Sequence, residues 1–350
     1  MRDMENKKWR LGVPRALFYY YYGTWWEAFF QALGAEVVVS PPTSKAIVDM
    51  GVSLAVGEAC LPVKVYYGHA AWLSPQVDAL FVPRLVSVEE KSFICPKFMG
   101  LPDMLRAALK PCPAIIDTTV NLARRPEEGL ARAVQGMGRA LGVKGRLVDR
   151  AMAAATIRYR AWLAGQLEGR AEATGRLAAK VFLSDVGENP GESNGSNGST
   201  GKSGVFRSGE ELLPVGIIGH GYLLYDRYLG MDIPGKVRAL GGRVIFPENL
   251  DPIQVETASQ QLVKRIYWSL GRKIMGAALY LMEQANVAGL IHLTAFGCGP
   301  DSLVGDLAER YARRRGKPFL LLTLDEHTGE ASLNTRLEAF MDMLHRRRSA

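Results

Sequence analysis

Short apolar runs alternate with helix-forming segments along most of this chain, and this alternation restricts its fold more than any other feature. Alternating strands and helices are typical of parallel sheets covered by helices. At 350 residues the chain is also longer than a single hydrophobic core usually supports. We therefore predict an α/β protein with mainly parallel sheets in two domains. The apolar runs with the length of buried strands include residues 77–82, 114–116, 215–218, 287–293 and 318–323.

Changes of composition divide the chain into four parts. Residues 1–121 carry the first α/β pattern. Residues 122–183 are rich in alanine, leucine and arginine with few helix breakers, so we predict a long helical connector. Residues 184–212 repeat serine, asparagine and glycine, a composition that cannot bury enough apolar surface to offset its ordering entropy. We predict a disordered linker there and a second α/β domain over 213–350.

Three local patterns predict how the chain enters its elements. Thr24 followed by Glu27 has the spacing of a capping box, which predicts a helix beginning at that point. Residues 52–56 have the composition of a buried strand that would lead to Cys60. Asp301 is expected to cap the helix that follows it.

Three of the four cysteines share one local setting. Cys60, Cys95 and Cys298 each follow an apolar run, and each is followed within two residues by proline, which cannot continue a strand ladder. This setting predicts cysteines at strand ends. Ligands of open α/β sheets bind beyond the carboxyl ends of the strands, so the three thiols could converge on one cofactor. Cys112 precedes a predicted strand and is not expected to be a ligand.

Two interpretations of these cysteines stay open on the residues alone. Thiolates are the soft ligands of iron–sulfur clusters, and three protein ligands would leave one iron open to water, hydroxide or substrate. Ferredoxin-like clusters, however, use close cysteine pairs. Here 34 residues separate Cys60 from Cys95, and 202 separate Cys95 from Cys298. Judged by spacing, three buried packing cysteines are favoured over iron ligands.

Composition argues against several other classes of protein. The formal net charge is +8, but the basic residues are scattered and cluster only near two predicted helix ends, where cations complement the helix dipole. We expect no nucleic-acid partner, although a mildly basic surface would suit an acidic partner or a CoA ester. The first ten residues are polar, and no apolar run reaches the ~20 residues of a membrane span. We expect a cytoplasmic protein with reduced thiols and no membrane association.

Polar residues near the cysteines and strand ends are candidates for proton transfer. Glu58 precedes Cys60 by two positions, and His220 and His327 lie just past predicted strands of the second domain. Such groups could relay protons or hydrogen-bond to cluster sulfur, or could be structural or solvent-exposed. We name Glu58 and His327 as candidate catalytic residues.

Four motifs carry a resemblance to a known family. They resemble the domain related to the activases of 2-hydroxyacyl-CoA dehydratases, often termed CoA protein activase. That domain is similar in turn to the iron–sulfur subunits of 2-hydroxyacyl-CoA dehydratases, benzoyl-CoA reductases and double-cubane cluster proteins. The resemblance covers most of the chain on both sides of the predicted linker. The motifs are GVPRAL (residues 12–17), GEACLPVK (57–64), CPKF (95–98) and GCGPD (297–301).

The resemblance implies two Rossmann-like lobes with a 4Fe-4S or double-cubane iron–sulfur cluster in the cleft. Cys60, Cys95 and Cys298 would each contribute one thiolate. The implied activity is that of a dehydratase, which is a lyase, or of a low-potential reductase in anaerobic metabolism, with an acyl-CoA substrate and association as a homo- or heterodimer.

The same resemblance bears on the source of electrons. We find no phosphate-binding glycine motif in a strand-turn context, because Gly201-Lys202-Ser203 lacks the required earlier glycine. Electron transfer to the cluster would therefore need a separate ATP-dependent activase. A non-catalytic cluster-binding scaffold and a metal-free α/β binding module remain the alternatives.

Overall fold

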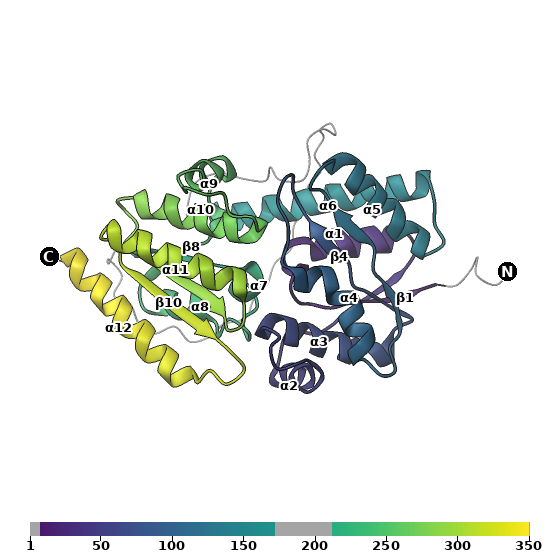
Figure 1. Cartoon of the computed structure of the whole chain (residues 1–350), viewed down its shortest axis with the longest axis horizontal. Coiled ribbons are helices and arrows are strands. Elements are labelled where there is room, and N and C mark those ends of the chain that lie inside the picture. Colours follow the sequence, from purple (N-terminus) through teal and green to yellow (C-terminus); the bar gives the residue numbers. More distant parts are fainter. Residues whose placement is uncertain (1–7, 172–211, 350) are drawn as a thin grey trace.

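The computed structural model describes residues 8–171 and 212–349, which form two α/β lobes lying side by side (Figure 1). The N-terminal lobe is purple to teal in the figure, and the C-terminal lobe is green to yellow. Every strand pair among the described residues is parallel, which confirms the predicted α/β class with mainly parallel sheets. The predicted linker 184–212 lies outside the described residues except for Leu212, as does the end of the predicted connector, 172–183.

The N-terminal lobe contains a main sheet and a smaller one. Its strands are β1 (Arg10–Val13), β2 (Glu36–Val39), β3 (Ala79–Phe81), β4 (Arg84–Ser87), β5 (Ala114–Ile116) and β6 (Thr119–Asn121). The main sheet has the order β2-β1-β3-β5, and β4 pairs with β6 in the smaller sheet. Leu11 of β1 stands opposite Val37 of β2 and Ala79 of β3, so β1 is buried between two neighbours.

The C-terminal lobe has one four-stranded sheet. Its strands are β7 (Leu213–Gly219), β8 (Gly242–Ile245), β9 (Gly289–Ala295) and β10 (Phe319–Leu324). Their order is β10-β9-β7-β8. All residues of β9 are buried, as expected for a central parallel strand covered on both faces.

Both main sheets have the same topology when the strands are numbered within each lobe. The first strand lies between the second and the third, and the fourth lies at the edge beyond the third. In such doubly wound sheets a crevice opens at the carboxyl ends of the first and third strands, where ligands bind. The topology therefore marks the ends of β1 and β3, and of β7 and β9, as candidate ligand positions.

Helices cover the sheets of both lobes. The N-terminal lobe has α1 (Tyr19–Ala32), α2 (Lys45–Leu54), α3 (Leu61–Leu73), η1 (Ser74–Gln76), α4 (Pro96–Ala108), α5 (Pro126–Ala140) and α6 (Arg146–Ala171). The C-terminal lobe has α7 (Gly221–Leu224), α8 (Ile233–Ala239), η2 (Pro247–Asn249), α9 (Pro252–Ser259), α10 (Ser269–Glu283), α11 (Gly299–Arg314) and α12 (Glu330–Ser349). Of the helices described, none combines the length and the apolar character needed to cross a bilayer.

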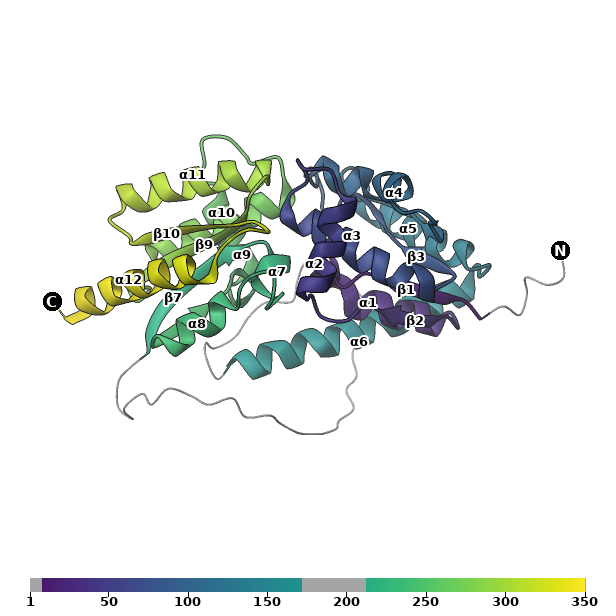
Figure 2. The ribbon, with the colours of Figure 1, turned by 90° about the horizontal axis from the view of Figure 1, so that it is seen from below.

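Helix α6 runs along α1 (Figure 2). Trp25 Nε1 donates a hydrogen bond to Thr156 Oγ1 at 3.2 Å, and the Tyr159 hydroxyl donates to the Tyr21 backbone oxygen at 2.9 Å. Within the described residues the predicted helical connector therefore consists of two helices, α5 and α6, and the longer one packs on the N-terminal lobe.

The two local predictions that concern the N-terminal lobe are wrong. Helix α1 begins at Tyr19, so Thr24 lies inside the helix and does not cap it. The predicted strand 52–56 is instead the end of α2 and the loop that follows. Ile47 and Gly51, four residues apart, form the buried face of α2 that packs on α3. This tertiary contact outweighs the strand-like composition of the run.

A buried polar chain joins the lobes beside one continuous apolar core. Asp226 follows α7 in the C-terminal lobe, and its Oδ2 accepts hydrogen bonds from the Tyr20 hydroxyl at 2.8 Å and from Thr43 Oγ1. Because Thr43 gives its proton to the carboxylate, its oxygen accepts from His69 Nε2, 3.0 Å away. The chain thus ties α1, α3 and the loop before α2 to the C-terminal lobe.

Candidate functional site

A pocket of about 350 Å³ lies between the two lobes, beyond the strand ends that the topology marks. Leu17 lines it from the segment after β1, and His220 lines it from the end of β7. Cys60, Cys95 and Cys298 all line the same pocket, so thiols distant in sequence meet at one place. That they bind a cluster stays a prediction.

Each of the three cysteines is the N-cap residue of a helix. Cys60 precedes α3, Cys95 precedes α4 and Cys298 precedes α11, and each helix has proline in its first turn, where a missing N–H costs little. The strand-end prediction is therefore correct only for Cys298, which follows β9, whereas Cys60 follows α2 and Cys95 follows the loop after β4. Helix N-termini carry partial positive charge, so three such ends at one pocket favour an anionic group there.

Burial controls the protonation of two of the thiols. Cys60 and Cys298 are buried, and Cys95 is half-buried. Burial raises the pKa of Cys60, an effect that the nearby Lys97 ammonium opposes. Burial also raises the pKa of Cys298, and the Asp301 carboxylate raises it further. Both groups are thiols when the pocket is empty, and a metal bound there would displace their protons.

The cysteine loops of the two lobes approach each other closely at Gly297. Its φ of +76° is in the left-handed region, and a Cβ at this position would lie 3.5 Å from the Cα of Cys60. Lys97 Nζ spans the same contact, donating to the Gly297 oxygen at 3.2 Å and to the Glu58 oxygen at 3.3 Å. Glycine therefore suits position 297 by its backbone conformation, and a Cβ there would make only an ordinary van der Waals contact with Cys60.

The segment before Cys95 pairs with the C-terminal lobe. Phe93 forms an isolated parallel bridge with Trp268, and its ring stacks on Tyr267 with centroids 4.9 Å apart. Nearby, Arg272 of α10 makes an ion pair with Glu89 at 2.6 Å, and both side chains are largely buried. These contacts hold the loop that carries Cys95 against the opposite lobe.

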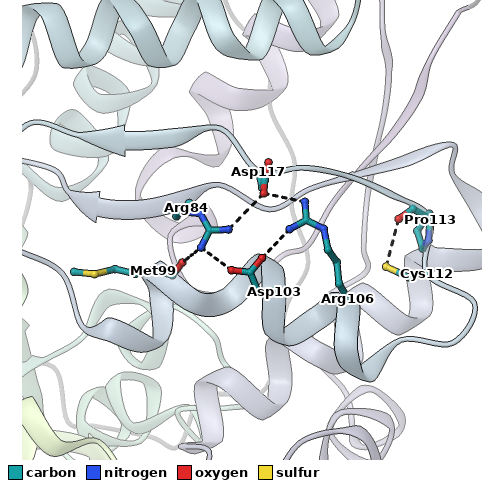
Figure 3. Close-up of polar contacts among 7 residues, drawn as sticks. All are labelled: Arg84, Met99, Asp103, Arg106, Cys112, Pro113 and Asp117. Carbon is teal, nitrogen blue, oxygen red and sulfur yellow. Dashed lines mark hydrogen bonds and ion pairs between the residues drawn. The ribbon is translucent and has the colours of Figure 1, made fainter.

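An ion-pair network anchors α4, the helix that Cys95 begins (Figure 3). Asp103 of α4 contacts Arg84 of β4 at 2.8 Å and Arg106 at 2.9 Å. Arg106 also pairs with Asp117, beyond β5, at 2.8 Å. In the same view the Cys112 thiol donates to the Pro113 oxygen, and Cys112 does not line the pocket. The network orients α4 without using the fourth cysteine.

A second buried polar chain lies behind Cys298. His292 in β9 donates from Nε2 to Asp301 Oδ1 at 3.0 Å, and the other carboxylate oxygen lies 4.0 Å from His220 Nε2. His220 Nε2 is 3.9 Å from Cys298 Sγ. The donor atoms of His220, Cys298 and Asp301 all lie within 4.8 Å of one another, close enough to hold one metal ion.

This chain places a charged carboxylate in the protein interior. Asp301 and His292 are fully buried, and His220 is 5% exposed. Burial by itself would raise the pKa of Asp301, but the nearby imidazoles of His292 and His220 and the hydrogen bond from His292 lower it to about 2. Burial lowers the pKa of His220, against the opposing effect of Asp301, so this imidazole is neutral near pH 7. The prediction that Asp301 caps α11 is wrong, because Cys298 is the N-cap and the carboxylate faces the imidazoles.

The two candidate catalytic residues lie apart from the pocket. Glu58 and His327 are exposed and do not line it. His327 follows Glu326, whose carboxylate pairs with Lys64 of α3 at 2.5 Å and so ties the loop after β10 to the other lobe. Catalytic roles for Glu58 and His327 stay predictions, and their positions do not add support.

Sequence reasoning named His220 as a group that could hydrogen-bond to cluster sulfur, but it did not identify Asp301 and His292 as the buried residues behind it. His292 was the detectable one, because it is a single histidine within an otherwise apolar run, Gly289–Ala295. A buried polar side chain in such a run needs a partner. Tyr222 and Trp268 on the pocket wall carried no local pattern that distinguishes them from core residues.

Comparison with known proteins gives matches to two family models, which together cover residues 10–344. Residues 248–344 match the family described as 2-hydroxyglutaryl-CoA dehydratase, D-component. Residues 10–250, more than half of the chain, match the CoA enzyme activase uncharacterised domain (DUF2229). A search of curated proteins found no match. The chain belongs to the family of the CoA enzyme activase domain and carries, in its last third, a domain of the 2-hydroxyglutaryl-CoA dehydratase D-component.

Proposed function

We propose that this protein is an iron–sulfur protein of the 2-hydroxyacyl-CoA dehydratase or benzoyl-CoA reductase type, with Cys60, Cys95 and Cys298 as cluster ligands. The observation that carries the proposal is the meeting of these three thiols at one pocket. The cluster, 4Fe-4S or a double cubane, would accept low-potential electrons from a separate ATP-dependent activase and present an iron without a protein ligand to an acyl-CoA substrate.

The residues present fit such a group. Thiolates are the ligands of iron–sulfur clusters, and three helix N-termini favour its negative charge. The remaining wall is largely apolar, with Phe98, Trp268 and Leu270 among its residues. An apolar wall excludes water and strengthens electrostatic interactions inside the pocket.

Each part of the chain has a distinct task in this proposal. Cys60 and Cys95 would bind from the N-terminal lobe, and Cys298 from the C-terminal lobe, so the ligand set is complete only when the lobes are together. Lys97 bridges the two cysteine loops, and the Phe93–Trp268 pairing holds the Cys95 segment. These contacts between the lobes would hold the three thiols near one another before any metal binds.

Iron and acid-labile sulfide content, with a visible spectrum, tests the proposal on protein expressed and purified without oxygen. About four irons per chain with a broad visible absorption are expected for a cubane, and about eight for a double cubane. Addition of an ATP-dependent activase of this enzyme class with ATP should bleach the visible absorption. Absence of iron after anaerobic reconstitution would refute the proposal and leave three packing cysteines.

One observation favours a second candidate, a cluster-binding electron-transfer partner that does not itself convert acyl-CoA. Among the described residues that line the pocket there is no carboxylate, and apart from the thiols and Tyr222 the titratable side chains are Lys97 and His220. A dehydration needs a positioned acid or base near the substrate, and the two residues predicted for that role, Glu58 and His327, do not line the pocket. Turnover assays with 2-hydroxyacyl-CoA esters and an activase separate the candidates, because only the enzyme consumes the ester.

A further inference from the structure

We infer that His220 is a positioning residue that donates its Nε2–H to the sulfur of Cys298, and that Asp301 and His292 hold it there. This inference rests on the proposed function, because it concerns Cys298 as a cluster ligand. It adds to the three thiolates a buried imidazole from the end of β7, the strand next to β9 in the sheet. His220 would set the reduction potential and the retention of the cluster without binding iron.

The geometry defines a chain of three polar side chains that ends at the sulfur. His292 Nε2 bonds to Asp301 Oδ1 at 3.0 Å, and this fixes the carboxylate. Asp301 Oδ2 has no hydrogen-bond partner and lies 4.0 Å from His220 Nε2. The same nitrogen is 3.9 Å from Cys298 Sγ, within the longer reach of a contact to sulfur.

The two neighbours of His220 Nε2 determine where its proton lies. Both the Asp301 carboxylate and the Cys298 sulfur are acceptors, and a neutral imidazole carries one N–H. The proton is therefore on Nε2, and Nδ1 is the unprotonated nitrogen, which has no partner. Carboxylates that orient an imidazole behind a metal site are a recurrent arrangement, and their loss weakens metal binding.

The contact between His220 and Cys298 has an electrostatic effect that packing alone would not have. Asp301 is a fully buried carboxylate within 4.8 Å of Cys298 Sγ, so its negative charge would repel the thiolate that a cluster needs. Nε2 of His220 lies 3.9 Å from Cys298 Sγ and 4.0 Å from Asp301 Oδ2, so the partial positive charge of its N–H would stabilise negative charge on both groups. Hydrogen bonds to cluster sulfurs stabilise the reduced state, which carries one more negative charge, and raise the potential.

The experiment compares wild type with His220→Ala, His220→Gln and the control His345→Gln, all prepared without oxygen. His345 bonds a backbone oxygen at the far end of the C-terminal lobe and does not line the pocket. Two properties are measured: the midpoint potential in a dye-mediated titration, and the rate at which a chelator removes iron.

The expected result is a lower midpoint potential for His220→Ala and iron release about 10- to 100-fold faster than from wild type. His220→Gln keeps an N–H donor and should recover part of both properties, whereas His345→Gln should match wild type. A residue that only fills space would not give this graded recovery. If His220→Ala does not fold, His220→Gln decides, because its weaker hydrogen bond should still give a lower potential than wild type and faster iron release.

Three results would overturn the inference. The first is that the midpoint potential and the rate of iron release of the His220 variants equal those of wild type. His220→Ala could instead lose one divalent ion, such as zinc, while iron and sulfide stay unchanged, which would make His220 a metal ligand. If wild type itself holds no iron, the proposed function fails and the inference falls with it, and that result is read on wild type before any variant is made.

Discussion

In the N-terminal lobe, Cys60 is positioned by two helices that touch through glycines, whereas in the C-terminal lobe Cys298 lies in front of a buried carboxylate and two imidazoles. A Cβ on Gly51 of α2 would lie 1.9 Å from the Lys64 oxygen of α3, and one on Gly68 would lie 1.9 Å from the Ile47 oxygen. The position of Cys60 thus depends on the small volume of two glycines, whereas that of Cys298 depends on hydrogen bonding and charge. Two lobes of the same strand order thus hold equivalent thiols by different physical means.

The largest expected effect comes from removing a thiol, whichever lobe holds it. We predict that Cys298→Ala loses cluster iron to the background of metal-free protein, because two thiolates cannot retain a cluster that needs three. Iron and sulfide assays on anaerobic protein measure this. Cys112→Ala is the matched control and should retain wild-type iron, since Cys112 lies outside the pocket. Full iron in Cys298→Ala would show that this lobe contributes no ligand.

Gly51→Ala tests whether the N-terminal lobe depends on the close contact between α2 and α3. The added methyl would overlap the α3 backbone, so we expect a loss of about 2–3 kcal/mol in the free energy of unfolding, measured with denaturant. The control is Gly100→Ala in α4, where a Cβ meets only the Met104 side chain at 3.6 Å and higher. That change should stabilise by up to about 1 kcal/mol through helix propensity. Equal effects at both positions would contradict the close-contact explanation.

Buried imidazoles contribute to the structure of both lobes, because His69 of the N-terminal lobe belongs to the polar hydrogen-bond chain that joins them. Burial and, to a smaller extent, Arg15 lower the pKa of His69 from 6.5 to about 3. Between these values the unfolded chain binds a proton that the folded protein does not, so stability falls as the pH falls.

Denaturant unfolding from pH 7 to pH 4 measures this loss. The slope contributed by His69 should approach about 1.4 kcal/mol per pH unit below 6.5. His69→Gln should remove that part of the slope, and His345→Gln should leave it. An unchanged slope in His69→Gln would mean that His69 can be protonated inside the folded protein.

The smallest expected effect is that of Lys97→Met, which removes the bridge between the cysteine loops of the two lobes. Both hydrogen bonds of Lys97 are at exposed positions, so we expect unfolding to be easier by about 1 kcal/mol or less. Thermal unfolding of metal-free protein measures it. A loss as large as that of Gly51→Ala would show that the lobes depend on this bridge more than on their shared core.

Several elements could be predicted because their signals are local. Strand β5 has the predicted bounds, and Pro62 lies in the first turn of α3. The prediction failed where a local pattern competed with a distant contact, as at residues 52–56, which form the end of α2 and the loop after it because α2 packs on α3. Apolar residues in a short run do not distinguish a buried strand from a buried helix without the partner surface.

The candidate site shows the same division between local and distant information. The proline after each cysteine was enough to single out the three cysteines that line the pocket. The same proline pattern predicts strand ends, whereas all three cysteines are N-caps of helices. His220 could be named as a candidate from its place after a strand. Its relation to Asp301 and His292 could not, because three residues from two strands and a helix meet only when the sheet order is known.

The sequence by itself determined the α/β class, the cysteines that stand out and the family to which the chain belongs, since periodicity and motifs are properties of neighbouring residues. Only the tertiary structure decided that the crevices of two like sheets face each other and that three thiols share one pocket. It also decided that a buried carboxylate lies behind Cys298, because burial and hydrogen bonding there depend on which segments the packing brings together.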